Sequence, residues 1–181
     1  LIILIGKDYT RRAGQFSKLD KVYEVTMKLG ETSATGDAEG EKSAVSSRQP
    51  SLSEIKAALQ KFSGEIMQTP PVFSAMKVNG QRAYKLAREG KAIQLEPRPV
   101  TIHKIELKNY SYPLVEFTAE VSSGTYIRSL VKDLGQELQT GAYMSGLRRT
   151  QIGQFNIKKV SKINDKELLN KIFKADQHCG Y

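Results

Sequence analysis

Apolar and polar side chains alternate at every second position in several stretches of the chain. In residues 114–121 the apolar positions alternate with Glu and Thr, and residues 21–29 place Tyr23, Val25, Met27 and Leu29 on one face. A period of two predicts strands with one buried face and one polar face. Further strands are predicted at residues 1–5, where five apolar residues suggest a buried strand, and at residues 73–78, 100–107 and 144–155.

Other stretches have the period of a helix. Residues 127–138 carry Ile and Leu at helical spacing on one face, and residues 51–62 open with the capping-box pair Ser51 and Glu54. Helices are also predicted at residues 83–88 and 161–173, a loop at 30–50, and a break at 64–71. Helices and strands mix without a regular βαβ rhythm. The pattern therefore favours an α+β fold with a mixed, mainly antiparallel sheet flanked by helices.

The junction between the strand at 114–121 and the helix at 127–138 carries unusual residues. Gly124 permits a tight turn, and Thr125 is a predicted N-cap of the helix. Arg128 falls in the first helical turn, where the helix dipole disfavours a cation. An arginine held there predicts a nearby carboxylate or phosphate. The alternative is that Tyr126 packs at the edge of the core and that Arg128 is solvated.

Charge and composition narrow the possible functions. The 181 residues include 28 Lys and Arg against 19 Asp and Glu, a net charge of +9, which favours a polyanionic partner. The alternative is a basic protein that only gains solubility from its charge. Cys179 is the single cysteine, and His103 and His178 are the only histidines, so we expect no disulfide, no metal site and no Ser-His or Cys-His triad. Chemistry would rest on Asp, Glu, Tyr, Lys and Arg. The absence of a long apolar run predicts a soluble globular protein without a membrane partner.

Basic residues recur beside Tyr or Gly in three places. These are residues 77–88, the pair Tyr126 and Arg128, and the pair Arg148 and Arg149. Guanidinium groups on phosphates with a tyrosine face under a base suit an unstacked RNA base. The recurrence favours RNA binding over the alternative of solvated strand ends.

An ordered set of motifs resembles the bacterial TruB-type tRNA pseudouridine-55 synthases. The motifs occur in family order and cover most of residues 1–160. They are DKVYEV at 20–25, DAEG at 37–40, PPVFSAMKVNG at 70–80, AREG at 87–90, RPV at 98–100, GTYIR at 124–128, DLG at 133–135 and LRRT at 147–150.

The resemblance implies an isomerase that converts uridine 55 of the tRNA T loop to pseudouridine. Such enzymes flip the target base out of the stack, and the carboxylate of an Asp acts as nucleophile. The resemblance implies no cofactor, the tRNA T arm as partner, a monomer and a cytoplasmic location. It implies catalytic roles for Tyr23 (stacking on the base and accepting the C5 proton), Tyr126 (lining the pocket) and Arg128 (pairing with the catalytic Asp). It implies substrate contacts for Arg11, Lys77 and Leu147, the last as an apolar pocket wall.

One departure from the family concerns the nucleophile. The family's catalytic Asp lies in a Gly-Thr-Leu-Asp-Pro-type loop just before the first strand, and no such motif is present. The chain also starts without Met, so we expect missing upstream sequence, an inactive chain and an Arg128 without its expected partner. Residues 1–160 would be a partial catalytic domain and residues 161–181 a helical tail. Alternatives are a catalytically inactive RNA-binding protein with the same cleft, or a protein-guided relative from an RNA–protein particle.

Overall fold

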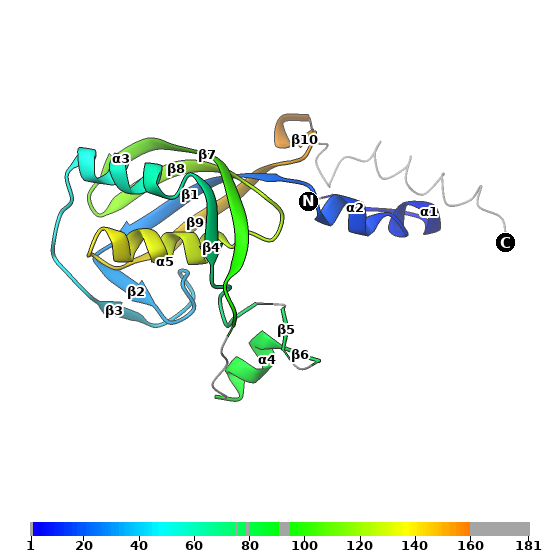
Figure 1. Cartoon of the computed structure of the whole chain (residues 1–181), viewed down its shortest axis with the longest axis horizontal. Coiled ribbons are helices and arrows are strands. Elements are labelled where there is room, and N and C mark those ends of the chain that lie inside the picture. The colour runs from blue at the N-terminus through cyan, green and yellow to red at the C-terminus, as the bar shows by residue number, and fades with distance from the viewer. Residues whose placement is uncertain (1, 75, 79, 91–94, 160–181) are drawn as a thin grey trace, which may run out of the picture.

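The computed structural model of the chain describes residues 2–74, 76–78, 80–90 and 95–159. A six-stranded sheet forms its centre (Figure 1), and every pair of neighbouring strands is antiparallel. This confirms the predicted α+β class with a mainly antiparallel sheet. The strands, in spatial order, are β10 (Phe155–Asn156), β9 (Ala142–Ile152), β1 (Lys21–Leu29), β8 (Leu114–Val121), β7 (Arg98–Ser111) and β4 (Gly64–Gln68).

Two helices cover one face of this sheet (Figure 1), α3 (Leu52–Lys61) and α5 (Ile127–Glu137). The alternating apolar positions of β1 and β8 point toward them, so Val25 and Phe117 pack in one core with Leu130 and Leu134 of α5. Phe117 is 1% exposed, and burying a side chain of that size stabilises the fold by about 2–3 kcal/mol. The helical period of 127–138 and the alternation of 114–121 thus predicted these elements and their buried faces correctly.

The start of α3 also agrees with the sequence. The Ser51 hydroxyl accepts a hydrogen bond from the Glu54 amide at 3.3 Å, and the Glu54 carboxylate accepts one from the Ser51 amide at 2.7 Å. These bonds satisfy two backbone donors that the first helical turn leaves free.

Smaller elements extend from this two-layer body. At the N-terminal side, α1 (Lys7–Thr10) and α2 (Ala13–Ser17) project away from the sheet, and neither contains a buried residue. A second extension projects below the sheet in Figure 1; it contains β5, β6 and α4. The remaining bounds are β2 (Glu31–Ser33), β3 (Lys42–Ala44), β5 (Lys77–Val78), β6 (Gln81–Arg82), α4 (Ala83–Arg88) and the 3-10 helix η1 (Ile157–Lys159).

Some sequence predictions were wrong. Residues 2–5 do not form a strand, and Ile3 is 59% exposed, because none of the described strands lies beside them to pair with their backbone. Residues 64–68, predicted as a break, form β4 because β7 supplies a full antiparallel ladder. Part of the predicted loop 30–50 forms the β2–β3 hairpin. The strand predicted at 73–78 contains only Lys77–Val78 among its described residues. The helix predicted at 161–173 lies outside the described residues.

Candidate functional site

Arg128 connects three segments that are distant in the sequence. It lies in the first turn of α5, and its side chain is 23% exposed. Nη1 donates to the carbonyl oxygen of Thr35 at 3.2 Å and to Oδ2 of Asp37 at 3.0 Å, while Nη2 donates to the carbonyl oxygen of Phe73 at 2.8 Å. The acidic partner predicted from the dipole argument is therefore present, and it is a carboxylate. Folding brings Asp37 to Arg128, and Asp37 is not the partner that the resemblance implied, which is the Asp of a Gly-Thr-Leu-Asp-Pro-type loop.

The Asp37 carboxylate is held in its charged form. Burial raises its pKa, but hydrogen bonds from the Thr35 hydroxyl and the Glu39 amide, together with the Arg128 charge, outweigh burial and lower the pKa below its usual value. The loop carrying Asp37 is fixed to β9, because the Met144 amide donates to the Gly36 carbonyl at 3.0 Å. Asp37 is thus held by a loop bonded to β9, and Arg128 is held by the first turn of α5.

The N-cap of α5 is Tyr126, not the predicted Thr125. Tyr126 has an extended backbone and makes no side-chain capping bond. Thr125 instead closes the preceding turn, since its amide donates to the Ser122 carbonyl at 3.3 Å. Gly124 has the positive φ of 87° that the tight turn requires. The Tyr126 amide finds its acceptor in the Gln68 side chain, a partner from β4 that local sequence could not reveal.

Tyr23 and Leu147 lie on neighbouring strands. Tyr23 is paired with Arg149 of β9 and Ala119 of β8, and Leu147 is paired with Val25 two residues along β1. Tyr23 is half-buried and packs against the core, whereas Leu147 is 46% exposed. Paired strand residues share a face, so Leu147 and Tyr23 both belong to the face of Val25. Leu147 thus lies near Tyr23 and its pairing partner Arg149. An apolar, an aromatic and a basic side chain together are able to hold a flat base.

The two remaining predicted residues lie at the periphery. Arg11 is the C-cap of α1, exposed and 4.0 Å from Asp8. Lys77 is exposed on β5, in the other extension of Figure 1. Neither is brought to Arg128 by a contact in the described residues. Both remain open to solvent, where a cation can meet a phosphate.

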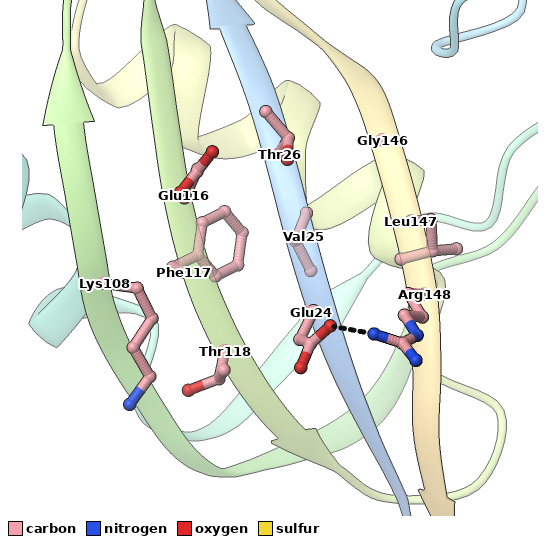
Figure 2. A pocket seen from close by; sticks show the side chains of 10 residues that line it. All are labelled: Glu24, Val25, Thr26, Lys108, Glu116, Phe117, Thr118, Gly146, Leu147 and Arg148. Atoms are coloured by element: carbon pink, nitrogen blue, oxygen red, sulfur yellow. Dashed lines mark ion pairs between the residues drawn. The ribbon is translucent and has the colours of Figure 1, made fainter. Parts of the chain in front are cut away.

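Figure 2 shows a hollow of about 460 Å³ across β7, β8, β1 and β9. Its charged side chains carry both signs, and Glu24 pairs with Arg148 at 3.5 Å. Glu24 and Thr26 alternate with the core residue Val25, so they belong to the sheet face opposite α5. Val25 and Leu147 also line the hollow, whereas Tyr23, Tyr126 and Arg128 do not. Its mixed charge does not favour an anion.

Within the described residues, no group of three or more His, Cys, Asp and Glu side chains could hold a metal ion. No helix in the same part of the chain is long and apolar enough to cross a membrane.

Two residues that contact Tyr126 or Arg128, Asp37 and Gln68, were not identified from the sequence. Asp37 lies in the DAEG stretch that was noted only as part of a resemblance, and its position beside a glycine-rich loop was the available signal. No sequence pattern marked Gln68, because a glutamine before Thr-Pro-Pro does not predict a buried hydrogen bond to a distant residue.

Two solved structures contain a chain that is similar in fold to this one. The chain aligns with one in the crystal structure of a Cbf5–Nop10–Gar1 complex at a TM-score of 0.64 and 26% identity, over 92% of this chain and 41% of that one. A chain in a structure of an H/ACA RNP bound to a substrate RNA containing 2'-deoxyuridine aligns at 0.62 and 24% identity, over 94% and 40% of the two chains, and shares the fold.

Sequence relatives identify the family. Residues 1–127 match the N-terminal domain of the TruB family pseudouridylate synthases, and residues 128–178 match the C-terminal domain of tRNA pseudouridylate synthase B. A tRNA pseudouridine synthase B of Clostridium novyi is 44% identical over 91% of this chain and 56% of its own length. One of Aquifex aeolicus is 41% identical over 91% and 58%. The chain belongs to the TruB family, and it spans little more than half the length of these relatives.

Proposed function

We propose that this chain forms part of a tRNA pseudouridine synthase that converts uridine 55 of the T loop to pseudouridine, as a monomer in the cytoplasm. Family membership supports the reaction class, and the relatives named above are tRNA pseudouridine synthases. The observation that carries the proposal is the Arg128–Asp37 ion pair. It lies inside two of the motifs that carry the resemblance and beside Tyr126.

Each residue of the site has a role in this proposal. The Tyr23 ring stacks on the flipped base and its hydroxyl takes the C5 proton, while Tyr126 and Leu147 line the pocket. Arg128 keeps a neighbouring carboxylate ionised, as it does for Asp37. The carboxylate of a nucleophilic Asp attacks C1′ and displaces N1 of the base. After the ring rotates, C5 attacks C1′ and the carboxylate leaves, and the proton lost from C5 is balanced by one gained at N1. No cofactor is needed for this isomerisation.

The nucleophile is proposed to lie outside the residues of this chain. Asp37 is a poor candidate, because three sets of donors already occupy its carboxylate oxygens. Hydrogen bonds that stabilise the charged form also lower its reactivity toward carbon.

Tritium release from a T-arm hairpin with C5-labelled uridine at position 55 tests the proposal. The chain is assayed alone and with an N-terminal segment carrying a Gly-Thr-Leu-Asp-Pro-type loop. A hairpin with cytidine at position 55 is the control substrate. Release only with the added segment supports the proposal, and release by the chain alone assigns the nucleophile to a carboxylate within it. Binding without release in either form would overturn the enzymatic proposal.

The second candidate is an RNA-binding protein without catalysis. The contacts of Arg128 favour it, because Asp37 already gives the guanidinium a carboxylate partner within this chain. Release only in the presence of a guide RNA would instead identify the protein-guided relative.

A further inference from the structure

Gln68 has a buried side-chain amide, and both its donor and its acceptor are bonded to the backbone of Tyr126. It is the last residue of β4 and is 1% exposed. Its Nε2 donates to the carbonyl oxygen of Tyr126 at 3.1 Å, and its Oε1 accepts from the Tyr126 amide at 2.8 Å. The side chain therefore bonds to Tyr126 much as a neighbouring strand would. Such a paired amide holds both the position and the orientation of the backbone that it contacts.

The residue that follows β4, Thr69, extends this connection. Ser129, 6% exposed, donates its hydroxyl to the Thr69 carbonyl at 2.8 Å. Arg128 then donates to the Phe73 carbonyl. Residues 68–73 are thus attached to the first turn of α5 at Gln68, Thr69 and Phe73. The direction of Arg128 depends on a backbone that Gln68 and Thr69 hold.

We propose that Gln68 is a positioning residue, which fixes the main chain of Tyr126 and thereby directs the Tyr126 side chain toward the bound RNA and keeps Arg128 beside Asp37. The part concerning RNA rests on the proposed function. The part concerning Tyr126 rests only on the contacts above. Gln68 itself is too deeply buried to touch a substrate.

The chemistry of the amide gives a selective test. Gln68→Met keeps the side-chain length but removes both hydrogen bonds, leaving the Tyr126 amide without its acceptor. Gln68→Glu keeps an acceptor but donates to the Tyr126 carbonyl only when the introduced carboxyl is protonated. Burial favours the protonated form. The Glu substitution should therefore restore the missing bond as the pH falls, whereas a general packing defect would not be repaired by a proton.

Two measurements are made on the chain over a range of pH, each as a ratio to the unsubstituted chain at the same pH. The first is hydrogen exchange of the Tyr126 amide by NMR, and the second is the dissociation constant of a T-arm hairpin. Gln68→Met should speed exchange and weaken binding by roughly thirtyfold, because two hydrogen bonds of about 1 kcal/mol each are lost. Gln68→Glu keeps the acceptor of the Tyr126 amide, so exchange there should stay slow, whereas hairpin binding should be weakened at high pH and should recover as the pH falls. The controls Gln136→Met and Gln136→Glu, on the exposed side of α5, should change neither ratio.

Each outcome decides the matter. Unchanged exchange and binding in Gln68→Met overturn the proposal, and so does a loss without acid recovery in Gln68→Glu. If Gln68→Met fails to fold, Gln68→Glu alone decides: binding that recovers as the pH falls supports the proposal, and weakened binding without recovery overturns it. An unsubstituted chain that does not bind the hairpin refutes the proposed function, while the exchange ratios still decide the role of Gln68.

Discussion

Nη1 of Arg128 lies 3.0 Å from Oδ2 of Asp37, although 91 positions separate the two residues in the sequence. The pair joins the first turn of α5 to the loop that follows β2. Both side chains are more than three-quarters buried, so solvent screens their attraction less than at the surface.

Removing the Asp37 charge should lower stability in a pH-dependent way. The native pKa of Asp37 is lowered, so its ionised form stabilises the fold above the unfolded pKa, and this contribution is lost as pH falls through the native pKa. Asp37→Asn should lower the free energy of unfolding by about 1–3 kcal/mol at neutral pH. The difference should shrink below about pH 4, near the usual pKa of an aspartate side chain. Urea unfolding at several pH values measures it.

Asp8→Asn, at an exposed carboxylate, should change little, and an equal loss there would contradict the assignment.

Replacing the guanidinium of Arg128 should loosen three segments at once. A lysine ammonium does not reproduce the planar fork that reaches Thr35, Asp37 and Phe73, so Arg128→Lys should cost about 2 kcal/mol in unfolding free energy. Hydrogen exchange in residues 33–40 should also rise.

Arg148→Lys is the matched control. Its partner Glu24 and Arg148 itself are more than half exposed, so the change should stay within about 0.5 kcal/mol. Equal effects of the two substitutions would show that the Arg128 contacts contribute nothing special.

The capping box of α3 should make a measurable local contribution. Ser51→Ala removes the acceptor for the Glu54 amide and should lower the unfolding free energy by about 1 kcal/mol. Thermal unfolding measures it against Ser47→Ala, an exposed serine outside the helix, which should have no effect. A neutral Ser51→Ala would mean that solvent satisfies this amide equally well.

The contact of α5 with β9 leaves no room for a methyl group at Gly135. A Cβ built there would lie less than 3.0 Å from the Ala142 backbone, so Gly135→Ala should destabilise the chain by about 1–3 kcal/mol. Gly14→Ala is the control, because nothing lies within 4 Å of a Cβ at Gly14 and the residue lies within α2. Chemical denaturation should show a loss only at Gly135. Should both variants prove equally stable, the packing of α5 on β9 is looser than described.

Local pattern predicted much of the scaffold. The period of two gave the positions of β1 and β8, helical spacing gave α5, and Ser51 with Glu54 marked the start of α3. These features depend on neighbours one to four residues away. The failures at residues 2–5 and 64–68 have the opposite cause, because a strand requires a partner strand that its own sequence does not specify.

In the candidate site, too, local features could be predicted from the sequence and long-range contacts could not. The sequence by itself determined that Arg128 sits in a helical first turn and that an anion should lie close to it, because the backbone dipole of a helix follows from its local conformation. Only the tertiary structure decided that this anion is Asp37, that the Phe73 carbonyl shares the guanidinium, and that Gln68 holds Tyr126. Those contacts join segments 55 to 91 positions apart. Their geometry depends on how the sheet and α5 pack together, which no stretch of the chain encodes alone.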